Sequence, residues 1–369
     1  MEGEPHMWSL PEPLATADQL VKSRFKVLNL WPSLSSLTYE VGLEPDMKRR
    51  FLDLNFKLIP MGLTPILRRE GGQVILRVLP AMVKRKRQWT RLSKLLFLAT
   101  IATVSLAGFT FTLSPVLQEL MPNMNPWLVV PTYTLALLLI VGLHELGHKI
   151  ACLYHGIKST PPLFIPAPPI PPFFPIGTFG AVILQESPPV NRDQLFDLGL
   201  LGPLVGFITA VLISAIGIQL SVLVPSALIA RLPEPPTELP VSPVFMLLIG
   251  WLMPEAGEDY VPLLHPVGFA GWVGTIITLL NAIPIGQLDG GHVLRAVTGR
   301  RLHSAISMVA TLFMAIFISP VMAIFGLMTA LRGHPGPLDD VSPLSPSRKA
   351  LFPLLFIICG LCFIRMSLF

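Results

Sequence analysis

Residues 135–149 read LALLLIVGLHELGHK, in which nine residues without a charge or strong polar group lead directly into two histidines and a glutamate. His144 and His148 are four residues apart, so in a helix both imidazoles project from one face, one turn apart, and can reach a single metal ion. Glu145 lies beside that face, where its carboxylate can serve as a general base toward metal-bound water. The stretch therefore predicts a metal-binding helix inside a membrane.

Lys149 leaves a second interpretation open. A charged residue directly after the motif suggests that the helix end is near, and polar side chains at a helix end can simply face water. We favour the metal site because the apolar run 135–143 precedes His144. Ionisable groups at membrane depth are costly, and they are usually paired, ligated or placed in a cavity.

The composition of the whole chain is that of a membrane protein. Of its 369 residues, 52% are hydrophobic and only 13% are charged, whereas soluble domains carry about 25% charged residues. This balance excludes an ordinary cytosolic enzyme and a disordered or fibrous chain. The sequence predicts a polytopic α-helical membrane protein.

About six apolar segments have the length of transmembrane helices. A further apolar stretch, 241–253, has about 13 residues, which is short for a hydrocarbon core of roughly 30 Å, so we interpret it as a re-entrant or interfacial helix. The predicted spans are 95–113, 127–153, 198–224, 267–283, 304–331 (interrupted at Pro320) and 350–364.

The N-terminal part predicts a small soluble α+β domain over residues 1–93, followed by a membrane-embedded domain over 94–369. Two glycines between apolar alternating runs are typical of a tight hairpin turn. The elements predicted in the soluble domain are a helix within 14–32, a strand over 37–41, and strands 64–67 and 74–78 joined at Gly71-Gly72.

Positive charge is concentrated at the N-terminal end. Residues 1–94 hold 16 of the 27 Lys and Arg, and many of these lie at 84–94, immediately before the first apolar segment. This pattern predicts a cytoplasmic flank, with a possible attraction to anionic lipid, and it does not indicate nucleic-acid binding. The first 20 residues carry acids and no apolar core, so we expect no secretory signal peptide there.

A proline-rich segment at 159–190 is apolar but not helical, since ten of its 32 residues are proline. Within it, residues 177–184 are typical of an extended strand. Apolar, non-helical backbone near a membrane is tolerated only against protein or around a watery cavity. We expect a re-entrant, β-like loop that lines a site, and the alternative is a proline-rich surface linker.

A further ligand is expected in a second polar motif far downstream. A zinc hydrolase site commonly has three protein ligands and one open position for water. Asp289 follows the apolar segment 267–283, where Pro284 and several glycines break the helix, and it is the only acid between Asp259 and Asp339. His292 competes for the same role, and we favour Asp289 because it follows the apolar run more closely.

Membrane topology brings the two motifs to one side. With the N-terminus in the cytoplasm, the second and fourth spans both return toward it, so that His148 and Asp289 lie near the same face. Arginines at 295, 300 and 301 follow the second motif, as the positive-inside rule favours. Neither motif was identified from the topology, so this agreement is an independent check.

These motifs together resemble the site-2 protease family of intramembrane zinc metalloproteases. The resemblance rests on His144-Glu145-Leu146-Gly147-His148, on the pattern Asn281-x-x-Pro284-x-x-x-Leu288-Asp289-Gly290, and on Gly202-Pro203-Leu204-Val205-Gly206 between them. It covers a core of roughly 127–303. The 177–184 stretch and the early soluble domain look like the longer plant-chloroplast, cyanobacterial and archaeal members.

The resemblance implies a three-helix catalytic core in the lipid. One Zn²⁺ would be held by His144, His148 and Asp289, and Glu145 would activate the water that attacks the peptide bond. We treat Gly202 and Gly206 as helix-packing residues, because a Gly-x-x-x-Gly pattern more often serves close packing than chemistry.

The substrate implied by the resemblance is a transmembrane segment of another protein, which must unwind before it is cut. Residues 177–184 would pair with the unwound strand by β-augmentation. Asn281 would donate hydrogen bonds to the substrate backbone, or alternatively bond to its own broken helix near Pro284. The predicted substrate-binding residues are Asn281, Gly177, Thr178, Phe179 and Gly180.

The sequence thus predicts a zinc-dependent intramembrane endopeptidase in a multi-pass arrangement, in a prokaryotic cell membrane, with its N-terminus in the cytoplasm and its active site near that side. Its partners would be the bilayer and membrane-protein substrates, with no nucleic acid and no oligomeric state specified. The alternatives are a non-hydrolytic metal transporter or sensor, and a scaffold or chaperone with a vestigial site. Glu145 discriminates among them, because a transport site needs no base between the two histidines.

Overall fold

The computed structural model describes residues 12–33, 35–81, 89–170, 176–230, 232, 238–253 and 259–364. The described chain forms two compact units. The first comprises the described residues of Met1–Lys86 together with Pro188–Leu195 and Pro335–Pro346, and the second comprises the rest. The basic residues 84–87 and residues 171–175 of the proline-rich segment lie outside the described residues.

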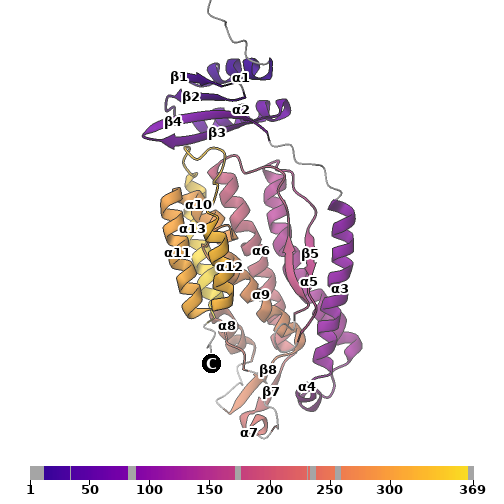
Figure 1. Cartoon of the computed structure of the whole chain (residues 1–369). Helices are drawn as coiled ribbons and strands as arrows, with labels where there is room; N and C mark the ends of the chain where they lie inside the picture. Colours follow the sequence, from indigo (N-terminus) through magenta and orange to yellow (C-terminus); the bar gives the residue numbers. More distant parts are fainter. Residues whose placement is uncertain are drawn as a thin grey trace, which may run out of the picture. The chain divides into compact units, whose positions relative to one another are not determined.

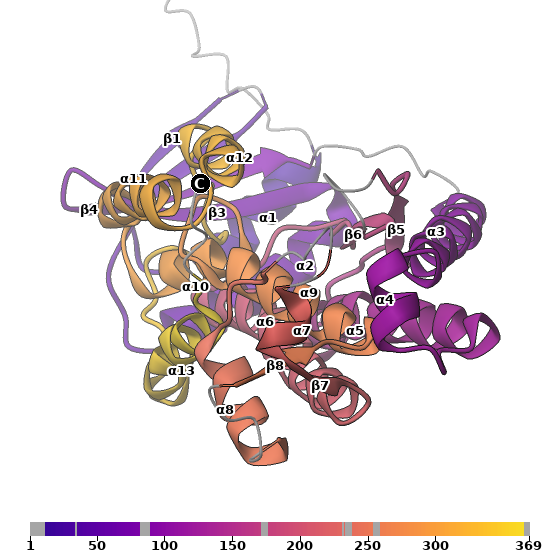
Figure 2. The ribbon, with the colours of Figure 1, turned by 90° about the horizontal axis from the view of Figure 1, so that it is seen from below.

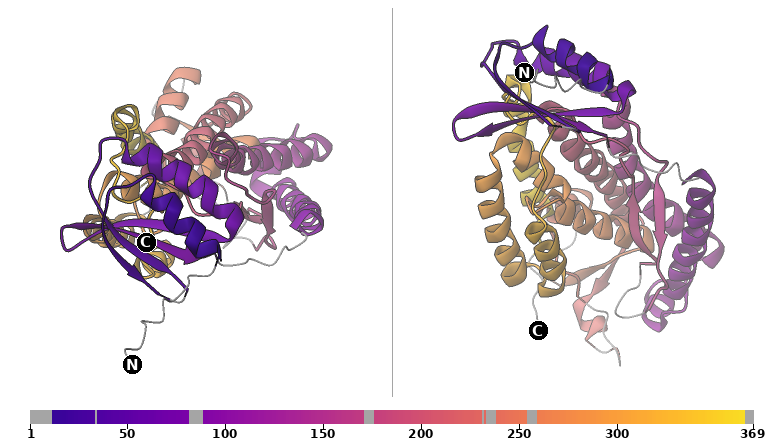
Figure 3. Two further views of the ribbon diagram at one scale, coloured as in Figure 1. Left: turned by 90° about the horizontal axis from the view of Figure 1, so that it is seen from above. Right: turned by 45° about the horizontal axis from the view of Figure 1, so that its top comes forward.

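The first unit is an antiparallel four-stranded sheet of order β1-β2-β4-β3, covered on one face by two helices that lie side by side (Figure 3). Buried side chains between the helices and the sheet, such as Phe51, Leu54, Tyr39 and Leu76, form its core. The elements are α1 (Glu12–Lys22), β1 (Val27–Pro32), β2 (Leu37–Val41), α2 (Met47–Leu58), the short 3₁₀ helix Ile59–Met61, β3 (Leu63–Glu70) and β4 (Gln73–Pro80).

The hairpin predicted around Gly71-Gly72 is confirmed. Strands β3 and β4 pair from Leu63↔Pro80 to Glu70↔Gln73, and both turn glycines have positive φ angles, 57° and 89°. A two-residue turn with both φ positive favours glycine, since other residues are strained there. The helix predicted over residues 14–32 is correct only in its first half, because α1 ends at Lys22 and residues 27–32 form strand β1.

The first unit also takes in two short segments that the sequence analysis assigned to the membrane domain. The backbone N–H of Leu67 in β3 donates to the carbonyl of Leu338 at 2.9 Å, so residues beside Leu338 continue the sheet edge. Asn191 forms a bridge with Asp339 in the same place. Three separate stretches of chain therefore build this unit.

In the second unit, three helices are long and apolar enough to cross a membrane: α3 (Trp89–Thr112), α5 (Pro126–Tyr154) and α6 (Arg192–Gln219), whose first residues belong to the first unit. Shorter helices surround them, as Figures 1 and 2 show. These are α4 (Pro115–Leu120), α7 (Ser226–Ile229), α8 (Pro243–Leu252), α9 (Pro266–Ala282), α10 (Asp289–Val297), α11 (Arg300–Phe317), α12 (Pro320–Leu331) and α13 (Pro346–Cys362).

Several boundaries differ from the predicted spans. The interruption predicted at Pro320 is confirmed: the segment 304–331 forms two helices, α11 and α12, which pack against each other and are separated at Ile318-Ser319. Helix α8 has 10 residues, about 15 Å of helix, which is half the thickness of the hydrocarbon core. The predicted span 198–224 ends earlier, at Gln219, and residues 222–225 form strand β7, which pairs with β8 (Tyr260–Leu263).

The proline-rich segment forms a β-hairpin. Strand β5 (Leu163–Pro166) pairs antiparallel with β6 (Thr178–Val182), which confirms the extended strand predicted within 177–184. Strand β5 lies along α3, and β6 approaches both α3 and α5 (Figure 1). The hairpin thus runs beside the helix that carries the histidine motif.

Candidate metal centre

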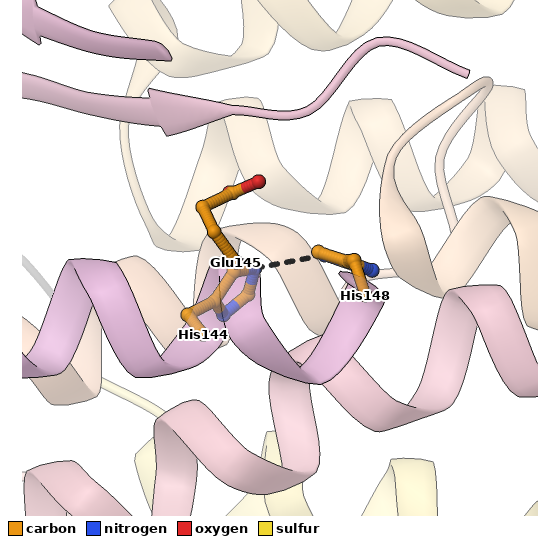
Figure 4. Close-up of side chains that lie close together, drawn as sticks. All are labelled: His144, Glu145 and His148. Atoms are coloured by element: carbon orange, nitrogen blue, oxygen red, sulfur yellow. Dashed lines mark hydrogen bonds between the residues drawn. The ribbon is translucent and has the colours of Figure 1, made fainter. Parts of the chain in front are cut away.

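Helix α5 presents two buried imidazoles to one point. The Nε2 atoms of His144 and His148 are 3.2 Å apart, and the two rings meet edge to face (Figure 4). This follows from the four-residue spacing, since residues i and i+4 lie on the same helical face. The sequence places both histidines after apolar residues, so the pair lies in the buried interior of the helix bundle.

Asp289 completes the group from another part of the chain. Its Oδ2 atom lies 3.2 Å from His144 Nε2 and 3.2 Å from His148 Nε2. Helix α9 ends at Ala282, an irregular loop follows, and Asp289 begins α10. His292, the competing candidate, has its Nδ1 atom 2.6 Å from His334 Nε2 instead.

The three atoms have the spacing that a zinc ion requires. Zinc bound tetrahedrally at roughly 2.0–2.1 Å holds neighbouring ligand atoms about 3.3 Å apart. The two nitrogens and the carboxylate oxygen form a triangle with sides of 3.2, 3.2 and 3.2 Å. Two imidazoles and one carboxylate are also the donor set of a catalytic zinc site with one open position. The residues present therefore fit Zn²⁺.

The orientation of His148 is set by helix α6. Its Nδ1 atom lies 2.8 Å from the backbone carbonyl oxygen of Leu198, so Nδ1–H donates there and the Nε2 lone pair is left for a metal. The Nδ1 atom of His144 is buried and has no hydrogen-bond partner among the described residues. The sequence does not predict this contact, because the acceptor is a backbone carbonyl that any residue at position 198 would supply.

Gly202 and Gly206 on α6 leave room for the two imidazoles. A β-carbon on Gly206 would lie 2.7 Å from His144 Nδ1, and one on Gly202 would overlap the His148 ring. The sequence analysis treated these glycines as general helix packing. Gly202 and Gly206 have the same four-residue spacing as His144 and His148, and this match could have indicated that the glycines face the two imidazoles.

Glu145 lies next to His144 on α5, and its side chain is directed toward the hairpin. One ligand atom from each of His144, Glu145 and His148 lies within 4.8 Å of the others, and all three side chains are buried. Figure 4 shows the Glu145 side chain directed toward the side where the hairpin strands run, and its carboxyl group contacts the backbone of Ile183, just after β6. The carboxylate is close enough to act on a water molecule at the open position.

The predicted substrate-binding residues of the hairpin divide into two kinds. Gly177 and Thr178 are buried in contacts within the protein: the carbonyl of Gly177 accepts from Thr103 Oγ1 at 2.7 Å, and Thr178 Oγ1 donates to the carbonyl of Ile165 at 2.9 Å. Phe179, by contrast, is 66% exposed. Gly180 has a φ of 96°, a conformation that favours glycine.

Asn281 lies in the last turn of α9 and is half-buried. Its side chain forms no hydrogen bond with another described residue, so the alternative bond to the broken segment near Pro284 is absent from the described part of the chain. The amide group is therefore available to an external partner.

Comparison with known proteins supports a peptidase assignment. The model of peptidase family M50 matches residues 132–323, which include both motifs. The chain is 30% identical over 211 residues to the probable zinc metalloprotease EGY2, chloroplastic, of Oryza sativa subsp. indica, covering 54% of this chain and 36% of that protein. It is 29% identical over 259 residues to the probable zinc metalloprotease EGY1, chloroplastic, of Arabidopsis thaliana, covering 66% and 44%.

A third relative is more distant but matches a longer part of the chain. It is the probable zinc metallopeptidase EGY3, chloroplastic, of Arabidopsis thaliana, 25% identical over 286 residues, which cover 72% of this chain and 47% of that protein. These matches span less than half the length of each of the three relatives. No solved structure gives a significant match.

Proposed function

The chain belongs to peptidase family M50, and on that premise we propose that it is a zinc-dependent intramembrane endopeptidase that hydrolyses peptide bonds in or near transmembrane segments of other proteins. The observation that carries the proposal is the triangle formed by His144, His148 and Asp289, with sides of 3.2 Å and with Glu145 beside it. A metal site without hydrolysis would not need this buried carboxylate.

The residues around the triangle have distinct roles in the proposed reaction. Zinc, when bound, lowers the pKa of a coordinated water toward roughly 7 and polarises a carbonyl oxygen. Glu145 accepts a proton from the attacking water and then gives it to the leaving amide nitrogen as the C–N bond breaks. The Leu198 carbonyl holds the His148 ring in the orientation that leaves Nε2 without a proton.

The free edge of the β5–β6 hairpin is suited to bind an unwound substrate strand. The carbonyl of Leu184 accepts from Thr160 N–H, and Glu186 N–H donates to the carbonyl of Lys158, so Leu184 and Glu186, just beyond β6, face the partner strand. In an antiparallel pair the intervening residues direct their backbone groups the other way. The Ile183 backbone contacts Glu145, so a substrate strand that pairs with the β6 edge at Ala181 would lie next to this carboxylate, and β-augmentation would deliver the scissile bond there.

The membrane arrangement that we propose has about six spans. The first unit would lie in the cytoplasm. Helices α5 and α9 would both run toward the cytoplasmic face of the membrane, so the metal site would lie near that face. The location that we propose is a prokaryotic cell membrane, whereas the printed names of the relatives place those proteins in chloroplasts. Accessibility labelling of single cysteines in intact cells tests the orientation.

Replacing Glu145 with Gln is the direct test of the reaction. Wild-type protein purified in detergent should cut one or more of a panel of single-span proteins at a site that mass spectrometry maps to the membrane segment. Glu145→Gln should retain about one zinc per chain and lose cleavage by at least about 100-fold, the lower range of a general base's contribution. His144→Ala should lose both.

Two outcomes would contradict the proposal. Zinc-loaded wild type that cuts none of the panel, while Glu145→Gln behaves identically in metal uptake, would favour a transporter or sensor. Wild type that holds no zinc at neutral pH would favour a scaffold.

A further inference from the structure

The proposed metal ligand Asp289 begins α10, directly after an irregular loop that is fastened on one side to α11. The backbone N–H of Gly286 donates to Ser307 Oγ at 3.1 Å, and the carbonyl of Gly286 lies 3.2 Å from His303 Nε2. Ser307 Oγ also lies 3.4 Å from the carbonyl of Pro284. His303 is only 1% exposed, so these bonds form away from water.

The other side of the loop is fastened to the chain that follows α12. Gln287 Nε2 donates to the carbonyl of Gly333 at 2.9 Å, and His292 Nδ1 lies 2.6 Å from His334 Nε2. A β-carbon on Gly286 would lie 2.6 Å from the backbone nitrogen of Ala330. The loop therefore packs closely against α12 at Thr329 and Ala330.

These contacts bracket Asp289 in the sequence. Gly286 and Gln287 precede it by three and two residues, and His292 follows it by three. The segment between α9 and α10, with Pro284 and Gly286, has no regular backbone hydrogen bonding of its own, and ordering such a segment costs conformational entropy. External bonds on both sides remove that freedom at the residue that must meet the two imidazoles.

We propose that His303 and His334 are positioning residues of the metal centre, which hold residues 284–292 between α11 and the end of α12 so that Asp289 Oδ2 meets His144 and His148. The inference rests on the proposed zinc site and extends it, because neither histidine touches the triangle itself. It assigns a purpose to α11 and α12, which lie outside the three long helices.

The geometry favours this role over a second metal site formed by the three histidines. The 2.6 Å separation of His292 Nδ1 and His334 Nε2 suits a hydrogen bond between the rings, whereas two nitrogens on one zinc ion lie about 3.3 Å apart. His303 Nε2 is engaged with the Gly286 carbonyl. A second metal remains as a distinct outcome of the test.

The test measures zinc affinity by competition with a chelator, using the full chain in detergent. Outer-shell partners of a metal site typically contribute 10–100-fold in affinity, so we expect His303→Leu and His334→Leu each to weaken zinc binding roughly 10–100-fold. His303→Gln should restore most of the loss, since its amide Nε2 can donate to the same carbonyl. The rescue distinguishes a specific hydrogen bond from general damage to the fold.

His265→Leu is the matched control. His265 caps α9 at the end opposite to Asp289, where its Nδ1 accepts from Val267 N–H at 3.2 Å. Its replacement removes another histidine, and with it a helix cap, from the same unit, and zinc affinity should stay within about twofold of wild type.

The possible results distinguish a failure of the positioning role from a failure of the proposed function. Wild type that binds no zinc would overturn the proposed function. Wild type that binds zinc while a folded His303→Leu variant binds it equally well would overturn only the positioning role. Two zinc ions per wild-type chain, of which His334→Leu loses one, would also overturn it and would make the histidine cluster a metal site.

Discussion

Single β-carbons decide whether α6 can lie against the metal ligands. Gly202 and Gly206 are the residues that face the His148 and His144 rings, and every other residue type would push a side chain into them. The two glycines therefore determine whether the imidazoles fit against α6, although they provide no metal ligand themselves.

Replacing Gly202 with Ala tests this close approach. The added methyl overlaps the His148 imidazole and would displace its Nε2 from the triangle, so we expect zinc affinity and cleavage to fall by roughly 10–100-fold, as for loss of ligand support. Gly360→Ala in α13 is the control, since nothing lies within 4 Å of its added β-carbon. A Gly202→Ala variant with wild-type zinc affinity would contradict the argument.

The sequence could predict the residues that we propose as ligands, but not those that we propose position them. His144, Glu145 and His148 lie within one helical turn, and fixed spacing in a helix fixes direction in space. His303 and His334 come from different elements, and only the folded chain brings them to the Asp289 loop. No periodicity within one element could have linked them.

At the scale of elements, local turn chemistry was predictable and element boundaries were less so. The turn between β3 and β4 has positive φ at both residues, which favours glycine, so Gly71-Gly72 predicted this hairpin. Residues 27–32 joined a sheet because β2 offers them a partner strand, a contact that helix propensity does not include. The break within 304–331 was predictable, because Pro320 begins α12 and proline is favoured at the first position of a helix.

Strand β6 allows a test of substrate pairing that leaves the metal alone. Ala181→Pro removes a backbone N–H from the strand edge at which we propose that the substrate pairs. We expect kcat/KM to fall about fivefold or more, as expected for a lost hydrogen bond worth about 1 kcal/mol, with zinc content unchanged. Ala181→Val, which keeps the N–H, should cleave at nearly the wild-type rate.

A result in which Ala181→Pro and Ala181→Val lose activity equally would point to the added side-chain bulk and not to the missing donor. Equal activity of both variants and wild type would exclude pairing at this edge.

At the scale of the whole molecule, the N-terminal unit is not a removable extension. Leu338 and Val190 belong to its buried core, although they come from segments far downstream. The sequence analysis could not assign them to it, because hydropathy identifies apolar stretches and not the partners that they pack against.

Deleting residues 1–93 should therefore also destabilise the two downstream segments that belong to this unit. Segments 188–195 and 335–346 would lose the sheet edge and core that order them. Limited proteolysis with mass mapping should find new early cuts within both segments, and thermal unfolding should begin at a lower temperature. A truncated protein as resistant as the full chain at these segments would show that they are ordered without the sheet.

The assembly of that unit from three stretches also constrains how it can be exchanged. The chain passes between the two units at five boundaries, after residues 86, 187, 195, 334 and 346. A domain formed by one continuous terminal stretch can be exchanged with a single recombination junction. Here a single junction would transfer only part of the first unit. A working chimera would need all three stretches from the same parent, so this unit and the protease core should be inherited together.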